Sequence, residues 1–141
     1  MKLRVNIILW LIPVLFLLNC TRGGIAPYDD PHVININDTI SPVITISKPL
    51  ADQVFHSGET ITIEGKVTDQ GLYQGKIQIL NSTSSTIVKE QEYEIHGLLE
   101  YNFSLSEVAS VSSISDYTIT VWFEDHGLNI TTKSFKVKVN P

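Results

Sequence analysis

Four acidic side chains are the residues of this sequence best suited to hold a metal ion. A hard cation such as calcium takes several oxygen ligands, which carboxylates supply. The four stand far apart in the chain, so only a fold that gathers their loops at one place makes them a site. Two of them have another explanation, because aspartate hydrogen-bonds its own backbone in turns and here precedes a glycine by two residues. The candidates are Asp38, Asp69, Glu124 and Asp125, and the glycines are Gly71 and Gly127.

Trp122 is a candidate for contact with a ligand. Alternation that buries Val121 and Phe123 turns Trp122 outward on its strand, beside residues such as Gln78 and Lys136 of neighbouring strands. An exposed aromatic ring offers a flat apolar surface to a sugar or to a partner protein. The alternative is that a neighbouring side chain or a long loop covers the ring.

No arrangement of residues in the sequence indicates catalysis. There is no G-x-S-x-G motif, no pair of cysteines and no glycine-rich phosphate loop. The histidines are far apart and lack the i, i+3 or i, i+4 spacing of metal motifs, so each is expected at the surface or in a turn. They are His32, His56, His96 and His126. We therefore predict that the protein is not an enzyme and has no cofactor, unless the acidic residues bind calcium.

The length and charge of the chain limit the classes of partner. The 141 residues suffice for one domain with a hydrophobic core but not comfortably for two. The formal net charge is −5. Removal of residues 1–19 takes away Lys2 and Arg4 and no acid, which leaves eight basic residues against fifteen acidic ones. So acidic a chain is poorly suited to the phosphates of nucleic acid, and we expect no such partner.

The first nineteen residues have the pattern of a signal peptide. Lys2 and Arg4 form a short basic start, and residues 5–18 are an apolar run broken only by Asn6 and Pro13. A membrane-spanning helix needs about 20 apolar residues, and this run falls short of that length. We interpret residues 1–19 as a signal peptide, with a permanent transmembrane helix as the weaker alternative.

Cys20 is the only cysteine and directly follows this segment. The sequence Leu17-Leu18-Asn19-Cys20 resembles the lipobox of bacterial lipoproteins, although Asn19 stands where that family usually has Gly, Ala or Ser. The resemblance implies that Cys20 becomes the acylated first residue of the mature protein and anchors it in a membrane. Thr21 is not the Asp that retains many lipoproteins at the inner membrane, so the outer membrane is favoured. The alternative is a buried or incidental thiol.

Residues 20–41 are predicted to be a flexible, lipid-anchored tether. They are rich in glycine, proline, aspartate and asparagine and show no sustained apolar period. Near the end of this range, Asp38-Thr39-Ile40 resembles the short O-glycosylation signal of Bacteroidota, which would place a sugar on Thr39.

After Pro42, apolar residues alternate with polar ones, which is the pattern of half-buried strands. Seven short strands separated by Gly-, Asn- and Ser-rich turns predict an all-β fold, a seven-stranded antiparallel sandwich over residues 42–141. Only the stretch from Ser106 to Ala109 offers a competing helical turn. The strands are expected at residues 43–47, 59–68, 76–80, 86–95, 99–105, 117–124 and 131–139.

The inward positions of these strands supply a core of sixteen apolar residues. At roughly 1.5 to 3 kcal/mol for each large side chain fully buried, such a core can offset the chain entropy without a disulfide. The predicted core is Ile44, Ile46, Ile61, Ile63, Val67, Ile77, Ile79, Tyr101, Phe103, Leu105, Ile119, Val121, Phe123, Phe135, Val137 and Val139.

The opening and closing strands resemble bacterial immunoglobulin-like domains, akin to cadherin and fibronectin type III modules and common on Bacteroidota lipoproteins. The resemblance implies an Ig-like sandwich in which Tyr117 is a tyrosine corner, its hydroxyl bonded to nearby backbone. Antibody-type domains differ, because they carry a cysteine pair and a core tryptophan that are missing here. The residues that carry the resemblance are Pro42, Pro49, Gly58, Val67, Asp69, Gly71, Leu72, Tyr117, Asp125 and Gly127.

In such a sandwich the B–C and F–G loops lie at the same end as the start of strand A. This would bring Asp69, Glu124 and Asp125 together, with Asp38 arriving on the tether. An acidic cluster of this kind is the arrangement that a calcium site needs.

These observations predict a non-catalytic, lipid-anchored protein of the cell envelope that presents one Ig-like domain for binding or for a structural role. Its partners would be the membrane, through the N-terminal lipid, and a protein or glycan of unknown identity. Two alternatives stay open. One is an accessory subunit of a larger surface assembly for nutrient uptake or adhesion, and the other is a calcium- or carbohydrate-binding module.

Overall fold

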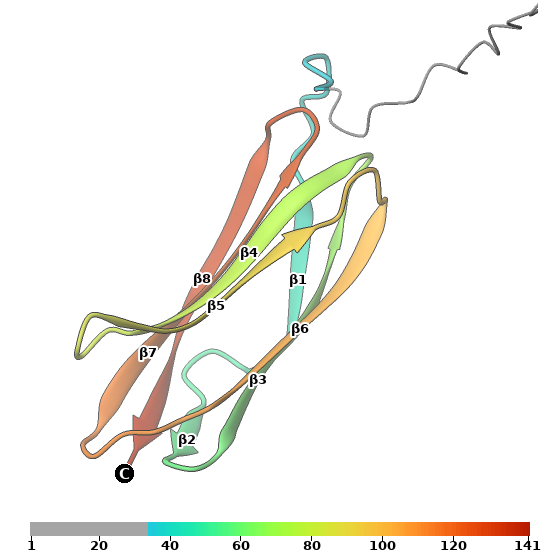
Figure 1. Ribbon diagram of the computed structural model, residues 1–141. Helices are drawn as coiled ribbons and strands as arrows, with labels where there is room; N and C mark the ends of the chain where they lie inside the picture. Colours follow the sequence, from blue (N-terminus) through green and yellow to red (C-terminus); the bar gives the residue numbers. More distant parts are fainter. Residues whose placement is uncertain (1–33) are drawn as a thin grey trace, which may run out of the picture.

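The computed structural model describes residues 34–141, which form eight β-strands in two sheets (Figure 1). The predicted signal peptide, Cys20 and the first part of the predicted tether lie outside the described residues. Residues 34–141 include no helix long and apolar enough to cross a membrane. The strands are β1 (Val43–Lys48), β2 (Val54–His56), β3 (Thr60–Thr68), β4 (Leu72–Asn81), β5 (Thr86–Glu94), β6 (Glu100–Val108), β7 (Ser115–Asp125) and β8 (Ile130–Asn140).

The predicted all-β sandwich is confirmed. One sheet has the order β1-β3-β6 and the other β2-β8-β7-β4-β5. There are eight strands rather than seven, because β2 was not predicted: three residues are too few to show alternation. The strands pair antiparallel, as predicted, with one exception: β2 runs parallel to the end of β8, where Phe55 lies beside Val139. The helical turn considered near Ser106 is wrong, since β6 pairs with β3 as far as Val108.

The core follows the alternation of the strands. All sixteen predicted core residues are buried or packed against the buried cluster, with Ile46, Tyr101 and Phe135 in the second group. The buried cluster also contains residues that short or irregular segments contribute, where no alternation was visible. These are Phe55, Leu72, Ile95 and Ala109; Tyr117, at an inward position of β7, also belongs to the cluster.

Two phenylalanines join the sheets at the centre of this core. The ring of Phe103 in β6 packs over Gly65, its cross-strand partner in β3, and the ring of Phe123 in β7 packs over Gly75, its partner in β4. The two ring centroids are 5.4 Å apart at an interplanar angle of 31°. Because each glycine leaves room for a ring directly opposite, both aromatic groups can lie flat between the sheets.

Four segments meet at one end of the sandwich, which we call the N-terminal end. They are residues 34–42, the β3–β4 loop at 69–71, the β5–β6 loop at 95–99 and the β7–β8 turn at 126–129. Backbone hydrogen bonds connect them: Asn35 N donates to His126 O at 2.7 Å, His126 N to Gly71 O at 2.9 Å, and Asp69 N to Leu99 O at 3.0 Å. Hydrogen bonds to the domain therefore begin before residue 42.

Gly75→Ala tests whether the aromatic contact needs its glycine. The new methyl group would overlap the ring of Phe123, so we expect a loss of about 1 to 3 kcal/mol in the free energy of unfolding, measured by denaturant titration. Gly71→Ala is the matched control, because an added Cβ there meets no atom within 4 Å. Equal stability of the two variants would contradict this account of the core.

Candidate functional site

Three of the four predicted metal-ligating carboxylates meet at the N-terminal end. Asp38, Asp69 and Asp125 each place one carboxylate oxygen within 4.8 Å of the others. They come from three separate segments, namely the chain before β1, the β3–β4 loop and the end of β7. We call this group the aspartate cluster.

Asp125 is the innermost member and is fully buried. Its Oδ1 accepts a hydrogen bond from Asn129 N at 2.8 Å, and its Oδ2 accepts one from Asn129 Nδ2 at 2.9 Å. These bonds close the β7–β8 turn around the carboxylate. Asp125 therefore shapes its turn, as the sequence offered as the alternative, and also belongs to the aspartate cluster.

Only one of the two carboxylate oxygens of Asp69 has a hydrogen-bond partner. Its Oδ2 accepts a hydrogen bond from Gly71 N at 2.9 Å, but its Oδ1 is buried without a hydrogen-bond partner. Burial raises the pKa of the Asp69 carboxyl above its ordinary value of 3.8; the bond from Gly71 opposes this, and the negative charges of Asp125 and Asp38 add to it. A nearby cation would relieve both the desolvation and the repulsion.

Asp38 lies in the segment that the sequence assigned to the tether, yet it is held against the domain. Its backbone oxygen accepts a hydrogen bond from Asn129 Nδ2 at 3.0 Å, so one amide group bridges Asp38 and Asp125. A Cβ on Gly127 would approach Asp38 O to 2.7 Å, which no side chain tolerates. Gly127 is therefore required by the close approach of this segment. The neighbouring Thr39 is exposed.

The prediction that Glu124 joins the cluster is wrong. Successive residues of a strand point to opposite faces, so an inward Asp125 forces Glu124 outward. There Glu124 Oε2 accepts a hydrogen bond from Gln74 Nε2 at 2.7 Å. The cluster therefore offers three carboxylates, and a calcium ion bound there would need water or backbone oxygens to complete its six to eight ligands.

Trp122 lies on the outer face of the five-stranded sheet, as predicted, and is half-buried. The neighbours were predicted wrongly, because Gln78 pairs with Thr120 and Lys136 with Thr118. Across the strands Trp122 stands between Lys76 and Thr132.

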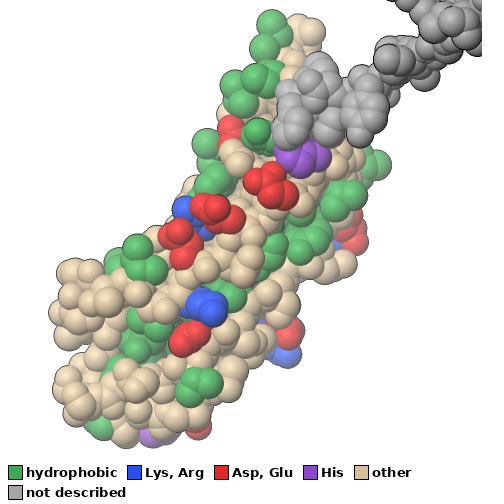
Figure 2. Space-filling view, viewed as in Figure 1, with side chains coloured by type: hydrophobic (Ala, Val, Ile, Leu, Met, Phe, Trp, Pro, Cys, Tyr) green, Lys and Arg blue, Asp and Glu red, His purple; other side chains and the backbone are tan. Residues whose placement is uncertain are grey.

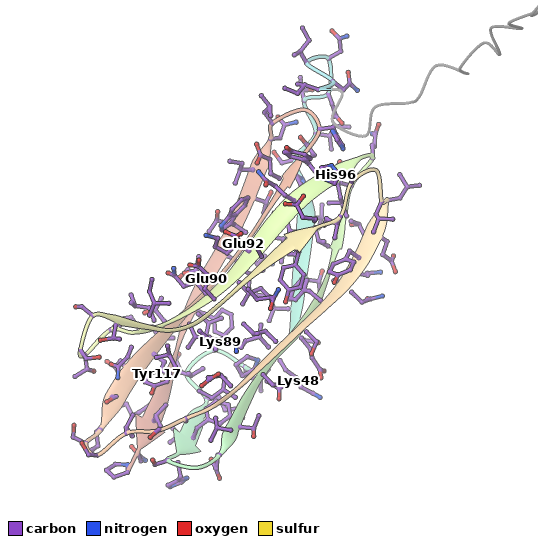
Figure 3. The ribbon with its side chains drawn as sticks, viewed as in Figure 1. Lys48, Lys89, Glu90, Glu92, His96 and Tyr117 are labelled. Carbon is purple, nitrogen blue, oxygen red and sulfur yellow. The ribbon has the colours of Figure 1, made fainter. Side chains whose placement is uncertain are left out.

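The same face carries a group of charged side chains on β4 and β5. Lys76 Nζ lies 3.1 Å from Glu90 Oε1 and 3.0 Å from Glu92 Oε1, and Gln78 Nε2 donates to Glu90 Oε2 at 2.7 Å. Figure 3 shows Glu90 and Glu92 along β5. The carboxylates of Glu92 and Glu90 raise the pKa of the Lys76 ammonium. The surface beside Trp122 is thus polar, and its charged side chains form ion pairs and hydrogen bonds with one another.

An aromatic group at the N-terminal end was not predicted from the sequence. The ring centroid of Tyr73 lies 4.8 Å from that of His96 and 5.0 Å from that of His126, and the two histidines are 5.7 Å apart. His96 Nε2 is also 2.9 Å from Glu94 Oε2. A signal was present, because the tripeptide His-Gly-Leu occurs at both 96–98 and 126–128 and marks two turns at this end.

Tyr117 is buried in β7, but the tyrosine-corner hydrogen bond is absent. No hydrogen bond of its hydroxyl occurs in the part of the chain that the structure describes, so the ring contributes by packing. Gly71 lies in the turn that the sequence offered as the alternative role of Asp69. Its N–H donates to Asp69 and its carbonyl accepts from His126, which links two turns.

Comparison with known proteins identifies a fold and no family. No family model matches the chain, and no curated protein matches it. Solved structures do match. An engineered protein has a TM-score of 0.51 at 16% identity over 72% of this chain, and the fibronectin(III)-like modules of CbhA from Clostridium thermocellum have a TM-score of 0.46 at 15% identity over 70%. The chain spans 20% of the first structure and 46% of the second.

A third structure is a CARDB domain from Pyrococcus furiosus in complex with di-metal ions. It has a TM-score of 0.41 at 15% identity, over 81% of this chain and 99% of that one. These likenesses concern the fold alone. The fold is an immunoglobulin-like sandwich, with β1-β3-β6 facing β2-β8-β7-β4-β5.

Asp69→Asn tests the electrostatic cost of the cluster. Because the folded-state pKa of Asp69 is raised, the folded protein binds this proton more tightly than the unfolded chain does. The stability that Asp69 contributes is therefore present below pH 3.8 and is lost as the pH rises through the folded-state pKa. We expect the Tm of Asp69→Asn to exceed that of the wild type by a few degrees at pH 7, and the difference to shrink toward pH 4.

Glu124→Gln is the control for this measurement, since Glu124 lies on the opposite face of the strand that carries Asp125. The account fails if Asp69→Asn lowers the Tm at pH 7, or if its difference from the wild type does not change with pH.

Calcium titration tests what the cluster can hold. An ion bound only by the folded state stabilises it by about 2.7 kcal/mol when its concentration is about 100 times the Kd. If the cluster binds calcium, the ion raises the Tm of the wild type and of Glu124→Gln, but not that of Asp69→Asn or Asp38→Asn. No shift in the wild type, or the same shift in all four proteins, would exclude the cluster as a calcium site.

Proposed function

We propose that the protein is a lipid-anchored component of a bacterial cell envelope that presents one Ig-like domain for binding or for a structural role. The observation that carries the proposal is the sequence Leu17-Leu18-Asn19-Cys20, with the only cysteine directly after an apolar run too short to span a bilayer. Cys20 would carry the lipid, and the outer membrane is the favoured location.

The Ig-like fold supports a binding or structural role for the domain. Its core consists of packed apolar side chains, and residues 34–141 contain no cysteine, so the proposal needs no folding role for the thiol of Cys20. In our proposal the domain is not an enzyme. The surfaces it offers to a protein or glycan are the outer face around Trp122 and the loops of the N-terminal end.

The principal alternative is an accessory subunit of a larger surface assembly, for example one for nutrient uptake or adhesion. A pull-down of the protein from solubilised membranes distinguishes the two roles, because they differ in which proteins are recovered with it. A stoichiometric protein partner favours the subunit, and its absence favours an independent binder.

Cys20→Ala tests the anchor. Without the thiol no acyl chain can be attached, and each buried methylene group contributes about 0.8 kcal/mol to membrane partition. We expect the wild type to fractionate with membranes, and its N-terminal peptide to carry the mass of a lipidated cysteine. We expect Cys20→Ala to lose both the modification and the membrane fraction of a mature protein.

Asn19→Ala provides the matched control, because it restores a residue usual in the lipobox and leaves Cys20 in place. It should be lipidated at least as efficiently as the wild type. A membrane fraction of Cys20→Ala equal to that of the wild type, with no lipid mass on the wild-type peptide, would overturn the proposal.

A further inference from the structure

The N-terminal end carries most of the exposed large hydrophobic side chains in residues 34–141. Thirteen such side chains are exposed in this range, and eight of them lie in the segments of the N-terminal end or in the residue directly after one, each at least 43% exposed. They belong to the segment 34–40, the first residue of β1, the β5–β6 loop, the β7–β8 turn and the first residue of β8. Figure 2 shows hydrophobic side chains protruding at this end. Such an asymmetric distribution differs from the scattered apolar residues of an ordinary surface.

These side chains stand on loops that are bonded to one another. Asn35 N donates to His126 O at 2.7 Å, which holds the segment carrying Ile34 and Ile36 against the turn carrying Leu128. The β5–β6 loop joins through Leu98 O, which accepts a hydrogen bond from Leu72 N at 2.9 Å. The exposed apolar groups therefore form part of one folded end of the domain.

Leu128 combines an exposed apolar side chain with an unfavourable backbone conformation. Its φ is 64°, in the left-handed region, where a residue with a Cβ is strained and Gly, Asn or Asp is usual. The side chain is 52% exposed, so burial within the domain does not account for a leucine at this position. A strained hydrophobic residue at the tip of a turn is explained if its side chain is used outside the domain.

The path of the chain favours a bilayer as that partner. Residue 34 lies at the N-terminal end, and Cys20 precedes it by fourteen residues. The predicted tether over that length would span about 20 Å on average and at most about 50 Å. The loops of this end contain no lysine or arginine, so contact with lipid would rest on aliphatic side chains at the interface and not on attraction to anionic headgroups.

We propose that the N-terminal end of the domain rests on the membrane surface, with aliphatic side chains such as Ile36 and Leu128 in the lipid interface. This inference rests on the proposed lipid anchor at Cys20. It gives the domain a fixed orientation. The loop at 109–114, which joins β6 to β7 at the opposite end, then faces away from the bilayer. The eleven residues of β7 separate the two ends by roughly 35 Å.

Quenching of a single tryptophan tests the orientation. In a Trp122→Phe background, mature protein lacking residues 1–19 has no tryptophan, because the other one is Trp10. Ile36→Trp and Leu128→Trp each place a probe at the N-terminal end, and Ile114→Trp places the control in the opposite loop. Each lipidated full-length mature protein is reconstituted into phosphatidylcholine vesicles with or without bromine on the acyl chains near the headgroup. Far-UV circular dichroism and thermal melting confirm folding.

We expect brominated lipid to reduce the fluorescence of the probes at 36 and 128 about twofold, because interfacial side chains sit about 5 to 10 Å into the headgroup region. The probe at 114 should keep its intensity. Vesicle-bound protein in which neither end is quenched, or both ends equally, overturns the orientation while the anchor stands, and leaves the apolar end to a protein partner. Absence of protein from the vesicles overturns the proposed anchor, and the orientation with it.

Discussion

The contact between the rings of Phe103 and Phe123 is the interaction on which the rest of this domain depends. It joins the two sheets at the centre of the core, and each ring lies over a glycine that leaves room for it. Antibody domains join their two sheets with a disulfide between strands B and F. Here the aromatic contact between β6 and β7 links the two sheets without a covalent bond. A protein whose only cysteine lies outside the sandwich needs such a solution.

With the sheets held in this way, the ends of β3, β5 and β7 fall at one end of the sandwich. The loops there are linked by backbone hydrogen bonds and by the Asn129 side chain, which connects Asp38 to Asp125. The same links force three carboxylates together, which places a buried, unpaired oxygen of Asp69 beside two other negative charges. Turn geometry and electrostatic strain are therefore two results of one arrangement.

The N-terminal end thus combines the start of the folded chain, the aspartate cluster and most of the exposed aliphatic side chains of the described residues. The outer face of the five-stranded sheet has a different character, with polar side chains and ion pairs such as those of Lys76. This division suits a domain that meets an apolar surface at one end and an aqueous partner elsewhere. In our proposal the sandwich acts as a rigid spacer between the membrane and that partner.

Much of this could be predicted from the sequence, because the period-two alternation of apolar residues depends only on local backbone geometry. It identified seven of the eight strands and the inward side chains of both sheets. It also placed Trp122 outward. The signal for the anchor is likewise local, since a short apolar run and one cysteine are contiguous. What local patterns could not show was β2, whose three residues find their place only by pairing with β8.

The tertiary structure alone decided which distant residues meet. Glu124 and Asp125 are equally acidic neighbours in the sequence, yet only the inward one reaches Asp38 and Asp69, because the pleat sends adjacent side chains to opposite faces. In the same way, His96 and His126 come together because two turns share one end of the sandwich. By itself the sequence determined seven of the eight strands and the position at which an anchor is predicted. The packing of the sheets determined the composition of the cluster, because residues far apart in the chain become neighbours only when the sheets close on one another.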